Sequence, residues 1–382
     1  MGKSLNGKEL GKGITQRKDG LYQARFTNRF GKRSTLYDKT YSGIIKKLRE
    51  AQYADEKELN VVDSNITLDE WFETWIDTCK KNCRANSIQT YNVRYNRIKK
   101  ALGWRRLTQL NLIVMQEAIN ALGTDNQRKE SKKVLVDMLN KAVDSELLTK
   151  NVAKQINTVV TKDKKKVQRV MTRQETEVFL TAAYETFYFQ LFVLALETGM
   201  RVGELCGLQW DDVDFTKNVI HVRHSLCYFQ KDGSYVFEMH DTKTESGMRD
   251  IPLTAKAIKA LKEQYMRKQS ILGRGIEPMK GYENLVFVTK NNQPTTEFLI
   301  TQSIRATLKR INNANSDTEF SRITPHTFRH TFATRYIEAG VQPKTVQKLL
   351  GHSQLQLTMD LYCHVTDDTL YEAVEKYEQA VL

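Results

Sequence analysis

The chain has 382 residues, of which 40% are apolar and 27% charged, and its 59 Lys and Arg against 45 Asp and Glu give a net charge of +14. This length predicts two or three domains, and the positive charge favours an anionic partner, with nucleic acid ahead of an anionic membrane. No apolar run approaches the ~20 residues of a membrane-spanning helix, and no secretion or myristoylation signal is present, which argues against a membrane partner. The five scattered cysteines are typical of reduced thiols in a cytoplasmic protein.

Residues 1–60 predict a small basic domain, since they hold 14 Lys and Arg against 7 Asp and Glu. Strands are predicted at Thr15–Arg17, Leu21–Thr27 and Ser34–Lys39, and Ser42 can cap a helix that runs to about Leu59. Alternation along the sheet places four polar side chains on the face turned away from this helix, where they could read a major groove or simply face solvent. These four are Arg17, Gln23, Arg25 and Thr27.

Residues 65–158 predict a second domain of about four helices. The first helix begins at the capping sequence Thr67-Leu68-Asp69-Glu70, Ser87 can cap the second, and the last two span Leu110–Ala121 and Gln127–Ser145. Basic side chains on the outside could follow a phosphate backbone, although each alone is also an ordinary solvated charge. The candidates are Lys80, Arg84 and Arg94.

Residues 159–169 contain the run Lys162-Asp163-Lys164-Lys165-Lys166 and no apolar periodicity, so they predict a basic linker. Lys164 and Lys165 could also contact DNA.

Residues 170–382 predict a mostly helical unit with a small sheet. Thr172 caps its first helix, and a buried helix at Phe187–Thr198 ends at Gly199. Strands are predicted at Val219–Leu226, Ser234–Asp241 and Met248–Pro252. Helices are predicted at 254–268, 295–312, 325–339, 343–350 and 355–363. The whole chain is therefore expected to be multidomain and mainly α, with small β-sheets.

Two arginines in this unit occupy positions suited to an anion. Arg201 lies between the helix-ending Gly199 and the next helix start, with Glu204 placed to hold its guanidinium. Arg329 lies one turn after His326, which follows the helix-starting Pro325 and therefore sits near free backbone amides. A structural Arg–Glu pair and a surface histidine are the ordinary alternatives.

Three further side chains could complete a reactive site. His352 follows the helix-ending Gly351, Tyr362 lies one position off the apolar stripe of its helix, and Lys243 lies between two predicted strands. Taken singly, each could be a loop, packing or surface residue. Together they suit an attack by a tyrosine oxygen on a phosphodiester, because arginines can stabilise the charge of the transition state and no carboxylate cluster for a metal accompanies them.

The segments TGMRVGEL, TKTESGMRDIPL, HTFRHTFAT, LLGHS and TMDLYCHV follow one another in this order and resemble the tyrosine recombinase (phage integrase) family. The resemblance implies a catalytic set with Tyr362 as nucleophile, 362 − 329 = 33 residues after Arg329. This set is Arg201, Lys243, His326, Arg329, His352 and Tyr362. The first two units are similar to those of conjugative-transposon integrases, which implies an arm-type DNA-binding domain at 1–60, a core-DNA-binding domain at 65–158 and a catalytic domain at 170–382.

The resemblance also implies the reaction: site-specific integration and excision of a mobile element through a 3′-phosphotyrosyl intermediate, with no metal or other cofactor. It implies double-stranded DNA as partner at core and arm-type sites, a homotetramer on two duplexes, and an excisionase or DNA-bending protein as accessory factor. A type IB topoisomerase and a non-catalytic DNA-binding regulator of the same fold are the alternatives within this chemistry. An RNA-binding protein is a third, without the expected aromatic motifs.

Overall fold

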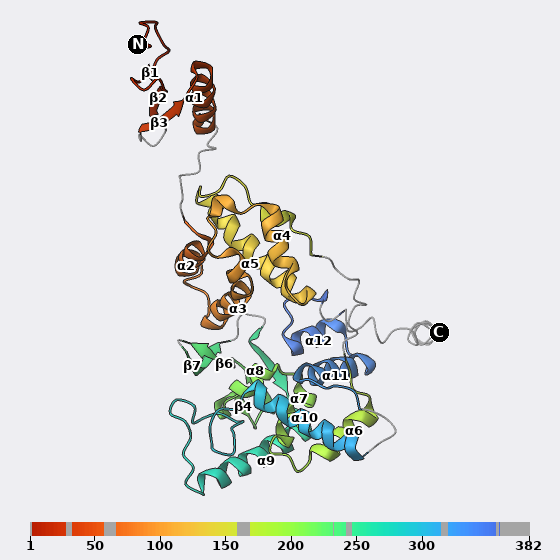
Figure 1. Ribbon diagram of the computed structural model, residues 1–382. Helices are drawn as coiled ribbons and strands as arrows, with labels where there is room; N and C mark the ends of the chain where they lie inside the picture. The colour runs from red at the N-terminus through yellow and green to blue at the C-terminus, as the bar shows by residue number, and fades with distance from the viewer. Residues whose placement is uncertain are drawn as a thin grey trace, which may run out of the picture. The chain divides into compact units, whose positions relative to one another are not determined.

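The computed structural model describes residues 2–27, 33–56, 66–158, 169–231, 233–241, 247–314, 320–356 and 359. The chain divides into two compact units, residues 1–163 and 164–382, each of which is described by itself (Figure 1). Within the described ranges, no helix is long and apolar enough to cross a membrane.

The chain begins with a three-stranded antiparallel sheet in the order β1 (Ile14–Gln16), β2 (Tyr22–Thr27), β3 (Arg33–Asp38), followed by α1 (Tyr41–Glu56). Ala24 pairs with Ile14 on one side and with Leu36 on the other. Alternation along β2 turns Ala24 toward α1, where Ile14 and Ile44 are also buried.

The predicted sheet and helix are present, but the prediction that Ser42 caps the helix is wrong: α1 begins at Tyr41, and the Thr40 hydroxyl accepts from the Gly43 amide at 3.1 Å. The predicted end of the helix near Leu59 lies outside the described residues.

The next buried cluster lies among four α-helices. These are α2 (Leu68–Cys79), α3 (Ala85–Leu102), α4 (Leu112–Asn120) and α5 (Asp125–Asp144), accompanied by the short 3-10 helices η1 (Leu107–Gln109) and η2 (Val152–Gln155). Thr67 and Glu70 form the predicted capping box of α2. The prediction for Ser87 is wrong: α3 begins two residues earlier, so Ser87 lies in its first turn and Arg84 is the N-cap.

The boundaries predicted at 1–60, 65–158 and 159–169 stay predictions. Residues 57–65 and 159–168 lie outside the described part of the chain. The buried apolar side chains near the sheet and those of the four helices do form separate clusters, which supports the proposed division of the first unit.

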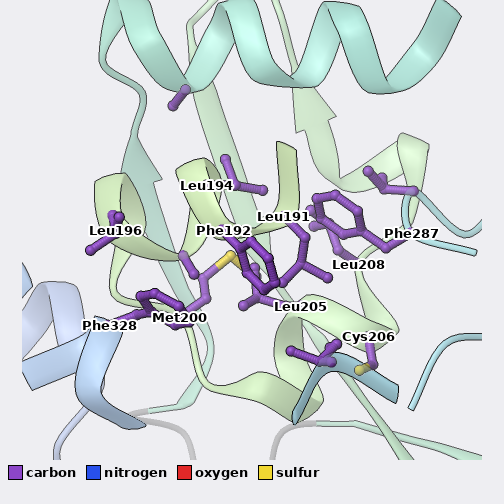
Figure 2. Close-up of a cluster of buried hydrophobic side chains, with 14 of the residues drawn as sticks. Leu191, Phe192, Leu194, Leu196, Met200, Leu205, Cys206, Leu208, Phe287 and Phe328 are labelled. Atoms are coloured by element: carbon purple, nitrogen blue, oxygen red, sulfur yellow. The ribbon is translucent and has the colours of Figure 1, made fainter. Parts of the chain in front are cut away.

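The second unit is built around α7. Its helices are α6 (Arg173–Ala183), α7 (Phe189–Thr198), α8 (Val202–Gly207), α9 (Ala255–Leu272), α10 (Glu297–Ala314), α11 (Pro325–Glu338) and α12 (Pro343–Leu350), with the 3-10 helix η3 (Trp210–Asp212). Figure 2 shows Phe192 and Leu194 of α7 among the buried side chains, with Met200 close to Phe328 of α11. Because α7 and α11 share this core, the polar residues at their ends are held in fixed positions.

Two small sheets complete the unit. β4 (Val213–Asp214), β5 (Val219–Val222) and β8 (Arg249–Pro252) form one sheet in the order β4-β5-β8, and β6 (His224–Lys231) pairs only with β7 (Ser234–Asp241) within the described ranges. The prediction of one strand at Val219–Leu226 is therefore wrong. The chain leaves the first sheet after Val222. Leu226 is buried as Val222 is and lies an even number of residues further on, and the polar His224 between them is the one interruption of the apolar alternation.

Candidate active site

Arg201 is held by the turn between α7 and α8. Gly199 ends α7 with φ +61°, a conformation that glycine adopts without strain, and Arg201 becomes the N-cap of α8. Its Nη1 donates to Glu204 Oε1 at 2.7 Å, and its Nη2 donates to the Gly351 carbonyl at 2.7 Å. The predicted contact with Glu204 is present, and the Arg201 side chain remains 39% exposed.

Arg329 reaches the same place from α11. The residue is only 4% exposed, because its neighbours Phe328 and Phe332 anchor α11 in the core. Its Nη1 donates to the Gly199 carbonyl at 2.7 Å, and its Nη2 donates to the Leu350 carbonyl at 2.6 Å. Burial, and then the charge of Arg201, lower the pKa of Arg329 to about 9, which leaves the guanidinium protonated at neutral pH.

A third arginine, Arg249, joins them from the start of β8. Its Nε donates to the Leu349 carbonyl at 2.6 Å, and its Nη1 and Nη2 lie 3.1 and 2.8 Å from the two oxygens of Glu204. The successive carbonyls of Leu349, Leu350 and Gly351 thus each accept from a different arginine. These carbonyls close α12, where the last carbonyls of a helix lack helical partners and carry partial negative charge.

The cluster has an excess of positive charge. Glu204 pairs with Arg201 and Arg249, whereas Arg329 donates only to backbone carbonyls. Among the described residues, three guanidinium groups thus accompany one paired carboxylate, an excess of 3 − 1 = 2 positive charges. Burial alone would raise the pKa of Glu204, but the hydrogen bonds and charges of Arg249, followed by the charge of Arg201, outweigh it and lower that pKa. A site of this kind favours an anion such as a phosphodiester, whose non-bridging oxygens match the guanidinium fork.

Two histidines border the arginines as neutral rings. Burial, and then the charges of Arg329 and Arg201, lower the pKa of His352 to about 3. Burial, and then His326 and Arg329, lower the pKa of His330 to about 4, and its buried Nδ1 has no hydrogen-bond partner within the described structure. His326 lies in the first turn of α11 as predicted, exposed, with its ring centroid 6.2 Å from that of His330.

These pKa values predict that the folded protein loses stability in mild acid. Below pH 6.5 the unfolded chain protonates both imidazoles, whereas the folded chain does not until the pH falls to about 4 for His330 and about 3 for His352. Stability is therefore full above pH 6.5 and decreases as the pH falls. Because both rings are only partly buried, we expect a combined loss of roughly 1 kcal/mol between pH 7 and pH 5.

Urea unfolding of the protein at pH 7 and pH 5 measures this loss, and His330→Gln and His352→Gln should each reduce it. An identical pH dependence in both variants would show that other groups are responsible.

Two members of the predicted catalytic set, Lys243 and Tyr362, lie outside the described residues, so their roles stay predictions. Lys243 belongs to the segment between Asp241, which ends β7, and Gly247, which precedes β8. Tyr362 follows Gly351 by 362 − 351 = 11 residues along the chain.

The DNA-binding candidates of the N-terminal sheet differ in exposure. Arg25 and Thr27 are exposed on β2, whereas Gln23 is only 8% exposed, with its side-chain amide 3.3 Å from the Tyr37 hydroxyl. Arg17 pairs with Asp19 at 3.3 Å and lies over the Tyr37 ring. Arg17, Arg25 and Thr27 are therefore all accessible on this face, whereas Gln23 is not.

Contacts within the protein engage several candidates of the helical region. Lys80 Nζ lies 2.8 Å from Asp137 Oδ2 and 4.8 Å from the ring centroid of Trp75, and Arg94 pairs with Glu130. Arg84 is the N-cap of α3, while Lys164 and Lys165 lie outside the described residues. A DNA contact by any of these five residues stays a prediction.

Comparison with known proteins places the chain in a family. Residues 146–369 match the phage integrase family, and residues 67–123 match the phage integrase N-terminal SAM-like domain. The chain is 27% identical over 389 aligned residues to the transposase from transposon Tn916 of Enterococcus faecalis, covering 95% of this chain and 93% of that one. It is 29% identical over 363 residues to a XerC-like tyrosine recombinase of Caldanaerobacter subterraneus, covering 90% of each.

Solved structures show the same fold. The integrase of transposon Tn1549 in complex with transposon right end DNA superposes with a TM-score of 0.68 at 24% identity, covering 81% of this chain and 99% of that one. A lambda integrase tetramer bound to a Holliday junction gives a TM-score of 0.55 at 20% identity, covering 91% and 97%.

The chain belongs to the phage integrase family, whose profile matches more than half of its residues. It is a tyrosine-type site-specific recombinase, and it resembles the integrases of conjugative transposons along nearly its whole length.

Proposed function

We propose that this recombinase integrates and excises a mobile element, with Tyr362 as the nucleophile that cuts each strand. The observation that carries the proposal is the convergence of Arg201 and Arg329 on the end of α12, in a cluster with excess positive charge. The similarity to a transposon's transposase over 95% of the chain supports a mobile element as the substrate.

In the proposed reaction, the two arginines bind the non-bridging oxygens of the scissile phosphate. The Tyr362 oxygen attacks the phosphorus, the bond to the 5′ oxygen breaks, and a 3′-phosphotyrosine and a free 5′ hydroxyl result. Lys243 gives a proton to the departing oxygen, and His326 accepts the tyrosine proton; such acid–base catalysis contributes about 10²–10⁴-fold per group. The neutral ring of His352 can donate one further hydrogen bond to the phosphate.

Rejoining reverses these steps with another strand. The 5′ hydroxyl of the second duplex attacks the phosphotyrosine, the new phosphodiester forms, and the phenol recovers its proton. Bond energy is kept in the protein–DNA ester throughout, so the reaction as proposed uses neither ATP nor a metal. Four protomers on two duplexes would perform it, as in the lambda integrase assembly on a Holliday junction.

We assign DNA contacts to all three proposed domains. The sheet of residues 1–60 binds arm-type sites through its exposed β2 residues Arg25 and Thr27, and the helical and catalytic domains hold the core site. An excisionase or DNA-bending protein would set the direction of the reaction.

A plasmid assay tests this function. One supercoiled plasmid carries two element-end sites and a second carries a single site. We expect recombinant products from the first and none from the second. Relaxation of both plasmids without recombinants would instead indicate a topoisomerase, and binding without strand breakage would indicate a regulator.

A further inference from the structure

Arg249 is bound on every side by groups of the protein. Its side chain is 6% exposed, and beyond the two oxygens of Glu204 and the Leu349 carbonyl it donates through Nη1 to the Gly247 carbonyl at 3.1 Å. A guanidinium that faces both oxygens of a buried carboxylate forms one of the stronger ion pairs of a protein interior. A phosphate could reach Arg249 only by displacing Glu204, which would leave a buried carboxylate without its principal partner.

Glu204 connects Arg249 to Arg201. The carboxylate is 3% exposed, and both of its oxygens are shared: Oε1 accepts from Nη1 of Arg201 and from Nη1 of Arg249, while Oε2 accepts from the Arg201 backbone amide and from Nη2 of Arg249. With Arg249 present, the Arg201 guanidinium needs to give Glu204 only one hydrogen bond. Without Arg249, we expect both terminal nitrogens of the Arg201 guanidinium to form hydrogen bonds with Glu204.

Arg249 also forms hydrogen bonds with two backbone carbonyls beside the arginine cluster, those of Leu349 and Gly247. The Leu349 carbonyl lies in the last turn of α12, three residues before His352, and Gly247 lies four residues after Lys243 in the sequence. One side chain therefore connects the start of α8, the end of α12 and the start of β8, none of which is adjacent to another in sequence.

We propose that Arg249 is a positioning residue for strand cleavage. It forms hydrogen bonds with both oxygens of Glu204 and with the Leu349 carbonyl at the end of α12, and it thereby keeps the guanidinium of Arg201 oriented toward the scissile phosphate. This inference rests on the proposed function, and it assigns Arg249 no contact with DNA.

The test is a comparison of Arg249→Gln, Arg201→Lys and the double variant. The substrate is a nicked duplex that carries the element-end sequence, and single-turnover cleavage is measured separately from the dissociation constant. We expect Arg249→Gln to slow cleavage about 10²-fold or more with a dissociation constant within about 3-fold of wild type. Because both changes act on the same guanidinium, the double variant should be no slower than the slower single variant, within about 3-fold.

If the two fold-reductions in cleavage rate multiply in the double variant, Arg249 acts independently of Arg201. If Arg249→Gln cleaves at the wild-type rate, Arg249 has no role in cleavage. Either result overturns the inference. Absence of cleavage in the wild-type protein would instead overturn the proposed function. Arg274→Gln, a change at an exposed arginine just after α9, is the matched control.

Thermal melting confirms that each variant is folded at the assay temperature. Should Arg249→Gln fail to fold, the combination with Glu204→Gln removes the unpaired buried carboxylate, and it replaces Arg249→Gln in the comparison. In the Arg249→Gln, Glu204→Gln variant the orientation of the Arg201 guanidinium no longer depends on Glu204, but it still depends on the position of α12. The rate of cleavage should therefore stay below that of the wild type. Wild-type cleavage by the combination would also contradict the proposed anchoring of α12.

Discussion

Tyr362→Phe is expected to bind element-end DNA with wild-type affinity and to form no covalent protein–DNA adduct. The change removes only the phenolic oxygen, so the bond to phosphorus can no longer form. Cleavage on a nicked duplex, where loss of a short strand prevents religation, should fall below detection on a denaturing gel.

Tyr184→Phe is the matched control, because Tyr184 is a tyrosine of the same unit whose residue is 69% exposed. It should form adducts at the wild-type rate. An adduct that persists in Tyr362→Phe would show that another group is the nucleophile.

Arg201→Lys is expected to slow cleavage by about 10²-fold or more while the affinity for DNA changes little. Lysine keeps the positive charge but cannot contact Glu204, the Gly351 carbonyl and a phosphate oxygen with one planar group, as the fork of Arg201 can. Charge alone supports binding, whereas the transition state also needs directed hydrogen bonds.

Arg169→Lys provides the comparison for this variant. Arg169 also pairs with a glutamate, Glu175 near the start of α6, and it does not belong to the arginine cluster. Its substitution should leave cleavage within about 2-fold of wild type. A small effect at Arg201, similar to that at Arg169, would contradict the role proposed for Arg201.

Much of the fold could be predicted from the sequence, because its helices carry strong local signals. The helix at 343–350 has its predicted bounds, the capping boxes at Thr67 and Thr172 form, and Gly199 ends α7. The errors came where tertiary pairing decides. Val222 and Leu226 belong to different sheets although both are buried apolar residues of one predicted strand, and a serine suited to capping lies inside α3.

The site was predictable in part. Helix ends and motif spacing indicated Arg201, Arg329 and His352, and the structure brings these three together around the end of α12. Arg249 was missed because nothing local distinguishes an arginine at the start of a strand; only the register of β5 with β8 and the fold of α12 bring it to Glu204. Its place in the segment TKTESGMRDIPL was the one available signal.

Peptide mapping of the trapped covalent complex identifies the residue that is joined to DNA. The wild-type protein is incubated with a nicked element-end duplex, digested with protease and nuclease, and analysed by mass spectrometry. We expect a nucleotide esterified through its 3′ phosphate to Tyr362. A nucleotide attached to any other side chain, or linked through a 5′ phosphate, would contradict this expectation.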